Sequence, residues 1–143
     1  MTVPHRAWIL AAVAIGGALG AVGRYELALA EPVTSGHFPW ATFVVNVIGS
    51  FALGIAVVML PERLPSTSVA RAFVAVGFCG GLTTFSTWMV ESVLLTRDGD
   101  GATAALYLLM GLIVGFVAVL AGVAIARNVV GGPAPSFDPA EDD

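Results

Sequence analysis

Polar residues stand at three places inside the long apolar stretches of this sequence, and they are its most informative feature. Arg24 follows a run of small residues, and Asn46 lies within a second apolar stretch. A third stretch contains glycines and hydroxyl residues from Gly77 to Trp88, and the acidic residue Glu91 follows it. Hydrogen-bonding groups are costly to leave unpaired in apolar surroundings, so each of these residues requires a partner or a ligand.

The elements that must position these residues are helices that cross a membrane. Of the 143 residues, 57% are hydrophobic and only 11% are charged, whereas a soluble domain of this size needs a more charged surface. About 20 mostly apolar residues are needed to cross the hydrocarbon core of a bilayer. Four segments qualify, and they run from near Ala7 to Ala30, Trp40 to Leu60, Val69 to Leu95 and Ala102 to Ala126.

Turn-forming residues separate the four segments and indicate short connections within one domain. Proline or glycine occurs at Glu31-Pro32, at Pro61-Glu62-Arg63 and in the run from Arg97 to Gly101. We therefore expect a four-helix transmembrane domain over residues 1–127 and a disordered acidic tail over residues 128–143. The first apolar segment lacks an A-x-A-like cleavage site, so we expect it to be retained as a helix.

Several classes of function lack the residues they require. The single cysteine, Cys79, cannot form an intrachain disulfide. The sequence contains no G-x-x-x-x-G-K-[ST] motif and no metal-ligand cluster of Cys and His, so neither nucleotide-driven pumping nor catalysis is expected. Much of the net charge of −4 comes from the last residues, and we expect no nucleic-acid partner.

The arginines indicate how the chain inserts, because the sequence contains no lysine. With the N-terminus in the cytoplasm, four arginines lie inside, namely Arg6, Arg63, Arg71 and Arg127. Arg97 then lies outside. This distribution favours a cytoplasmic N-terminus by the positive-inside rule, but the bias is weak. A chain with so weak a bias can insert in both directions, which would permit an antiparallel homodimer.

Small residues recur at helical spacing in the first and fourth segments. Gly16, Gly20 and Arg24 share one helix face, and glycines at this spacing allow another helix to approach closely. Arg24 either extends its charge to the membrane surface or has a structural or electrostatic role at an ion entrance. The same spacing recurs in the fourth segment at Tyr107, Gly111 and Gly115.

Asn46 and Glu91 each have two interpretations. Asn46 shares a helix face with Thr42, Gly49 and Ser50, and its amide either bonds a neighbouring helix or faces a substrate pathway. Glu91 is an acidic residue within the third segment, which makes it a functional candidate. It is alternatively the hydrogen-bonding partner of another helix.

The run from Gly77 to Trp88 predicts a broken helix. Glycines and hydroxyl residues make a continuous helix unfavourable at this point in the third segment. A break near the membrane midplane would free backbone carbonyls and amides to bind ions, and such a break is tolerated only inside protein or beside a cavity. The alternative is an unbroken packing helix that is rich in glycine and serine.

Three stretches together resemble the small bacterial fluoride channels of the CrcB or Fluc family of fluoride exporters. They are Gly16–Tyr25, Thr42–Ser50 and Gly77–Trp88, and they occur in order over nearly the whole chain except the tail. The resemblance implies a fluoride-selective channel of the cell membrane that exports fluoride passively. It also implies an antiparallel, dual-topology homodimer with two pores and a sodium ion at its centre, or a dimer with a paired homologous subunit.

The resemblance assigns roles to individual residues. Asn46 corresponds to the pore asparagine and Phe85 to the first of two pore phenylalanines, while the second falls at Trp88. The backbone carbonyls of Gly80 and Thr83 correspond to those that hold the sodium ion. The other residues that the resemblance adds to the fluoride pathway are Thr84, Ser86, Thr87, Tyr107 and Glu91.

This chain departs from the family pattern at two kinds of position. Besides Trp88, it has Gly111 and Gly115 in the fourth segment, where some relatives have serine. A polar track along this segment would then need Tyr107, backbone groups or water in place of the missing hydroxyls. An indole is also larger than a phenyl ring and carries an N–H donor.

The chemistry of fluoride agrees with these assignments. Fluoride is small and strongly hydrated, so a pore must replace its water with donors such as the Asn46 amide and hydroxyls. The positive edge of an aromatic ring such as Phe85 can face an anion without binding it too tightly for conduction.

Two other functions remain open at this stage. A small multidrug-type, proton-coupled transporter would need an acidic residue in the middle of the first segment, where none occurs, since Glu26 lies beyond Arg24 near its end. An accessory subunit without transport would explain the glycine faces but not the polar run from Gly80 to Thr87.

Overall fold

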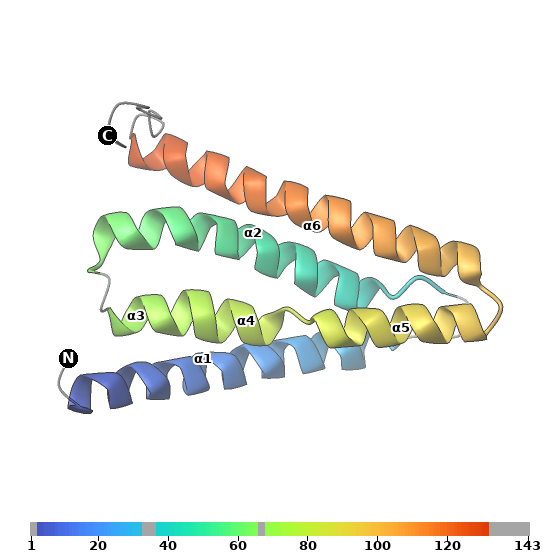
Figure 1. Ribbon diagram of the computed structural model, residues 1–143, viewed down its shortest axis with the longest axis horizontal. Helices are drawn as coiled ribbons and strands as arrows, with labels where there is room; N and C mark the ends of the chain where they lie inside the picture. Colours follow the sequence, from blue (N-terminus) through green and yellow to red (C-terminus); the bar gives the residue numbers. More distant parts are fainter. Residues whose placement is uncertain (1–2, 33–36, 66–67, 132–143) are drawn as a thin grey trace, which may run out of the picture.

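The structure, a computed structural model, describes residues 3–32, 37–65 and 68–131. All the regular secondary structure in these residues is helical (Figure 1). The elements in chain order are α1 (Val3–Ala30), α2 (Trp40–Arg63), α3 (Val69–Arg71), the π-helix η1 (Ala72–Phe78), α4 (Cys79–Leu82), α5 (Phe85–Arg97) and α6 (Gly101–Val130). The elements from α3 to α5 form one run, which is interrupted only between α4 and α5.

Four helical runs are long and apolar enough to cross a membrane. They are Arg6–Ala30, Trp40–Arg63, Val69–Arg97 and Gly101–Val130. Successive runs point in opposite directions, so α1 begins and α6 ends at the same end of the bundle (Figure 1). The prediction of an all-α chain with four membrane-crossing helices is confirmed.

Two helices extend further than the sequence predicts. The turn expected at Pro61-Glu62-Arg63 is wrong, because these residues form the last turn of α2. Proline removes one N–H from the helical ladder, but Leu64 N–H still bonds the Leu60 carbonyl at 2.8 Å and closes the turn.

At the other end of the sequence, α6 continues to Val130, three residues beyond the domain boundary expected at residue 127. Gly131 then ends the helix with a positive φ of 72° and an N–H bond to the Arg127 carbonyl. The rest of the predicted tail, residues 132–143, lies outside the described residues.

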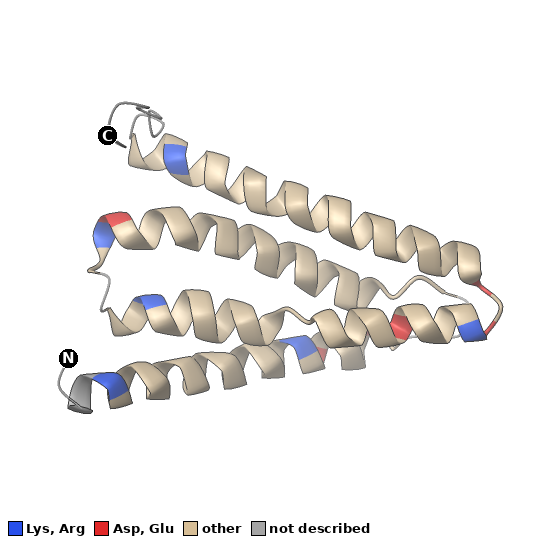
Figure 2. Cartoon of the chain, in the orientation of Figure 1, with Lys and Arg blue, Asp and Glu red and all other residues tan. Residues whose placement is uncertain are grey.

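Charged residues lie mainly near the ends of the four runs (Figure 2). The end of the bundle where α1 begins also holds the end of α2, the start of α3 and the end of α6 (Figure 1). The arginines at these helix ends are Arg6, Arg63, Arg71 and Arg127. Arg97 ends α5 at the opposite end. The positive-inside rule therefore favours the cytoplasm for the end of the bundle that holds four arginines.

Glycines bring the helix backbones into direct contact. A Cβ atom at Gly16 would lie 2.5 Å from the Phe73 carbonyl oxygen, and one at Gly20 would lie 2.6 Å from the Leu82 nitrogen. The predicted glycine face of the first segment therefore packs within the chain, where α1 lies along η1 and α4. Because η1 and α4 cover this face, Gly16 and Gly20 do not supply a surface for a second chain.

The contact between α2 and α6 is built in the same way. A Cβ atom at Gly54 would overlap the Val119 carbonyl, and one at Gly122 would overlap the Phe51 carbonyl. These two glycines were not predicted from the sequence to be packing residues. Their signal was weak, because the single glycines of an apolar helix do not reveal which neighbour they face.

The outer surface of the bundle is strongly apolar. Between 11% and 22% of the residues in the most apolar part of each run are buried, and large side chains such as Leu10, Leu112 and Phe116 are well exposed. Alanine and glycine instead supply much of the buried interior. Large apolar side chains outside and small residues inside are expected where lipid or another apolar surface surrounds the helices.

Replacing Gly20 by alanine should destabilise the chain, because the added Cβ atom would meet the backbone of α4, which cannot rotate away. Overpacking of this kind costs about 1–3 kcal/mol. Thermal unfolding in detergent, followed by circular dichroism, measures the effect. Gly23→Ala is the matched control, since a Cβ there meets only a Leu82 methyl carbon at 3.7 Å. Equal melting temperatures for the two variants would contradict the backbone contact.

Candidate functional site

The site is built around two extended residues between α4 and α5. Helix α4 ends at Leu82, and Thr83 (φ −77°, ψ 154°) and Thr84 (φ −148°, ψ 125°) have extended backbone. Helix α5 begins at Phe85, and the Thr84 hydroxyl oxygen caps it by accepting the Thr87 N–H at 3.2 Å. Two successive extended residues deprive the neighbouring backbone groups of their helical partners.

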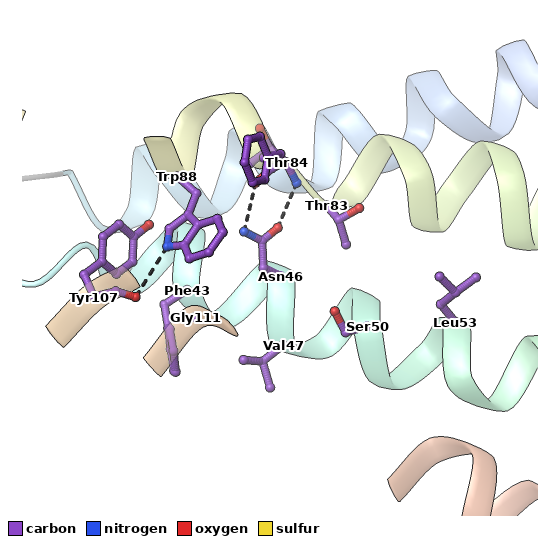
Figure 3. Close-up of a pocket in the computed structure, with 11 residues that line it drawn as sticks. Phe43, Asn46, Val47, Ser50, Leu53, Thr83, Thr84, Trp88, Tyr107 and Gly111 are labelled. Carbon is purple, nitrogen blue, oxygen red and sulfur yellow. Dashed lines mark hydrogen bonds between the residues drawn. The ribbon is translucent and has the colours of Figure 1, made fainter. Parts of the chain in front are cut away.

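Asn46 on α2 supplies the missing partners for Thr84. Its side-chain nitrogen donates to the Thr84 carbonyl at 3.0 Å, and its side-chain oxygen accepts the Thr84 N–H at 2.7 Å (Figure 3). The hydrogen bond to a neighbouring segment, one of the two interpretations of Asn46, is therefore present. No other described residue accepts the second hydrogen of this amide nitrogen. Asn46 thus holds the extended segment in place and still offers a donor.

A cavity of about 260 Å³ lies beside this pair, and we call it the Asn46 cavity. Its wall combines hydrogen-bonding groups with aromatic rings (Figure 3). The lining residues are Phe43, Asn46, Val47, Ser50, Leu53, Thr83, Thr84, Phe85, Trp88, Tyr107 and Gly111. The cavity can therefore offer both N–H or O–H donors and ring edges to a small solute.

Three of the aromatic rings that line the Asn46 cavity contact one another in sequence. The centroids of Phe85 and Trp88 are 5.6 Å apart with an interplanar angle of 77°, and Trp88 meets Tyr107 at 6.4 Å and 86°. The Trp88 indole N–H points at the Tyr107 carbonyl over a long distance of 3.4 Å. Trp88 thus lies in the cavity wall. Phe85 also reaches outward, because 70% of its surface is exposed in the single chain.

A second cavity, of about 310 Å³, lies between α1, α2 and α5, and we call it the Arg24 cavity. Its polar lining residues are Arg24, Tyr25, Glu31, Thr42, Thr87 and Glu91. The Arg24 Nε atom donates to the Gly81 carbonyl at 3.4 Å, near the end of α4. Arg24 is therefore anchored beside the interruption of the third run and contributes positive charge to this cavity.

A buried carboxylate connects the two cavities. Glu91 is only 8% exposed, and it accepts the Thr42 hydroxyl at 2.8 Å and the Tyr107 hydroxyl at 2.6 Å. Thr42 and Glu91 line the Arg24 cavity, whereas Tyr107 lines the Asn46 cavity. Two strong donors compensate the burial of the carboxylate, and their hydrogen bonds join side chains from the walls of both cavities.

The structure brings most of the predicted site residues to these two cavities. The Asn46 cavity holds Asn46, Thr83, Thr84, Phe85, Trp88 and Tyr107, and the Arg24 cavity holds Arg24, Thr87 and Glu91. Ser86 and Gly80 are exposed and line neither cavity. The Ser86 hydroxyl oxygen lies 3.3 Å from that of Thr84.

The sequence analysis missed the pairing of Thr42 with Glu91. It placed Thr42 on the face of Asn46, one helical turn earlier, which was a usable signal. The partner was not predictable from this spacing, since Glu91 is 49 residues away. It also missed that Gly111 accommodates the Trp88 indole, because a Cβ at Gly111 would lie 2.8 Å from three indole atoms.

A family model described as "CrcB-like protein, Camphor Resistance (CrcB)" matches residues 11–123, which include both cavities' main polar residues. The chain belongs to the CrcB family. The resemblance drawn from its sequence is therefore confirmed.

Curated relatives of this CrcB protein share more than two fifths of its residues over the aligned lengths. It is 47% identical over 122 residues to fluoride-specific ion channel FluC 3 of Streptomyces avermitilis, an alignment that covers 85% of the chain and 60% of the relative. It is 47% identical to fluoride-specific ion channel FluC of Chlorobium chlorochromatii, and that alignment covers 83% of the chain and 92% of the relative. It is 43% identical to fluoride-specific ion channel FluC of Hahella chejuensis, and that alignment covers 91% of the chain and 100% of the relative.

Removing one of the two hydroxyl groups that donate hydrogen bonds to Glu91 should destabilise this CrcB protein. Thr42→Val keeps the shape of the side chain but leaves one carboxylate oxygen unpaired, at a cost of about 1–3 kcal/mol. Thr42→Ser retains the hydroxyl and serves as the control, and Tyr107→Phe tests the second donor. The melting temperature in detergent is the measurement. A valine variant as stable as the parent would show that the hydrogen bond contributes nothing.

Proposed function

We propose that this protein is a fluoride-selective channel that lets fluoride leave the cell passively and so lowers its cytoplasmic concentration. The observation that carries the proposal is its identity of 43–47% to relatives named fluoride-specific ion channel, two of which it covers almost entirely. The protein is accordingly a multi-pass protein of the cell membrane and not an enzyme. The chemistry of the two cavities supports the same function.

The Asn46 cavity offers what a dehydrated fluoride ion requires. The amide of Asn46 has a donor that no described residue uses, and Ser50 supplies a hydroxyl. The rings of Phe85 and Trp88 meet edge to face, and ring edges carry partial positive charge. This combination stabilises a small anion moderately, which conduction requires, because an ion that binds too tightly does not leave.

Arg24 and Glu91 give the proposed pathway its electrostatic profile. The guanidinium of Arg24 attracts anions to the Arg24 cavity, which we assign as a pore entrance. The Glu91 carboxylate, which lines the same cavity, would repel an anion, but the Thr42 and Tyr107 hydroxyls offset part of its charge. The remaining residues that we assign to the pathway are Thr84, Ser86, Thr87 and Trp88.

We further propose that two chains associate in opposite orientations and form two pores. One chain alone leaves Phe85 70% exposed beside the Asn46 cavity, so one wall of the pathway is incomplete. Gly80 is also exposed, and a Cβ there would meet no atom within 4 Å, so another backbone can approach. The partner is a second copy of this chain or a paired homologous subunit.

A sodium ion at the centre of this dimer is the remaining part of the proposal. The carbonyls of Gly80 and Thr83 lie at the end of α4, and no described residue donates a hydrogen bond to either. Carbonyl oxygens are hard ligands that suit a cation of this kind. Each chain would supply two ligands, so evidence against an inverted pair of chains would also count against this site.

Asn46→Asp should abolish fluoride efflux. The substitution removes both N–H donors and places a negative charge where the anion must pass, and it also loses the bond to the Thr84 carbonyl. A fluoride electrode measures efflux from loaded liposomes, with a cationic dye in parallel to test the multidrug-type alternative.

Gel filtration of the same Asn46→Asp preparation checks that the dimer persists. Near-normal fluoride efflux through a folded Asn46→Asp dimer would remove Asn46 from the pathway. Dye efflux without fluoride efflux by the parent protein would overturn the proposed function itself.

Reporter fusions at the C-terminus should show that the chain inserts in both orientations when it is expressed alone, as a dual-topology homodimer requires. Crosslinking in membranes should trap the two orientations in one dimer. Matched fusions to a protein of known single orientation serve as the control. A single orientation in cells without any homologous subunit would contradict the homodimer and favour the paired subunit.

A further inference from the structure

The indole of Trp88 lies directly on the backbone of α6 at Gly111. A Cβ atom at Gly111 would be 2.8 Å from the Trp88 atoms Cε2, Cζ2 and Nε1, which is closer than such contacts occur in folded proteins. The same indole directs its N–H toward the Tyr107 carbonyl, one helical turn earlier. A side chain at position 111 therefore requires the Trp88 indole to shift.

The next glycine along this face has no such role. A Cβ atom at Gly115 would meet only the Ser50 hydroxyl oxygen, at an ordinary distance of 3.9 Å. The close contact is thus specific to Gly111 and is not a general property of the glycines on α6. This difference between two glycines one turn apart supplies an internal control.

We propose that Trp88 and Gly111 are a size-matched pair that sets the width of the Asn46 cavity. Both residues line this cavity, so the indole has the α6 backbone on one side and open cavity beside it (Figure 3). A side chain at position 111 would displace the indole away from α6 and into the cavity. Gly111 is then a positioning residue for Trp88, and this inference rests on the proposed function of the cavity as a fluoride pathway.

The pair also determines where the indole donor points. With the indole seated on Gly111, the Trp88 N–H is directed at the Tyr107 carbonyl. Displacement would break this long bond and turn the donor toward the cavity. A larger residue at position 111 should therefore both narrow the pathway and add an N–H group that holds fluoride more strongly.

Four variants test the proposal in liposomes. Gly111→Ala should lower fluoride efflux about fivefold, the rate factor for a barrier raised by the lower end of overpacking energies. Trp88→Phe removes the atoms that the new methyl group meets, so the double variant Trp88→Phe/Gly111→Ala should conduct like Trp88→Phe alone. Gly115→Ala should conduct like the parent. Unchanged efflux in Gly111→Ala, or an equal loss with and without Trp88→Phe, would overturn the size-matched pair.

Fluorescence tests the contact independently of fluoride. With Trp8 and Trp40 replaced by phenylalanine, Trp88 is the one emitting indole, and Gly111→Ala should shift its emission maximum whereas Gly115→Ala should not. An unchanged spectrum in Gly111→Ala would overturn the contact. A parent protein that carries no fluoride would instead overturn the proposed function, and with it the role of the pair in a pathway. Gel filtration of every variant shows whether it is still folded, so that a change in efflux or emission is not mistaken for unfolding.

Discussion

The double hydrogen bond between Asn46 and Thr84 is the constraint on which the rest of the site depends. Backbone N–H and C=O groups must be satisfied inside an apolar bundle, and two extended residues cannot satisfy their own. One side-chain amide supplies both a donor and an acceptor to the same residue. With its backbone fixed in this way, Thr84 caps α5, and the direction of α5 then places Trp88 and Glu91 beside their cavities.

Glycine packing on the opposite side of the third run supports this arrangement. Gly16 and Gly20 hold α1 against η1 and α4, and their contact brings Arg24 to the Gly81 carbonyl just before the interruption. The Asn46 hydrogen bonds on one side and the backbone contact with α1 on the other thus hold the same short segment, the end of α4 and the two residues after it. The apolar outer surface contributes nothing to this specificity, because lipid satisfies any apolar side chain equally well.

The sequence was sufficient for the features that depend on local composition. Four apolar lengths predict the four helical runs, and the unusual polarity of Asn46 and Glu91 marks them as site residues. It was insufficient where the outcome depends on a distant neighbour. Nothing near Pro61 shows that α2 can continue for one more turn, and nothing near Gly16 shows that its face meets η1 of the same chain. Likewise, Glu91 reveals a need for donors but not that Thr42 and Tyr107 supply them.

The π-helical segment η1 sets the angular phase between α3 and α4 in the third run. Its hydrogen bonds span one residue more than those of an α-helix, as in the bond from Cys79 N–H to the Val74 carbonyl. Residues on either side of η1 therefore do not belong on one helical wheel, and spacing rules of three and four residues fail across it. Gly77, inside η1, and Gly81, after it, both meet α1, whereas the extended residues Thr83 and Thr84 turn the chain toward Asn46. The contact with α1 and the contact with Asn46 therefore belong to different backbone segments.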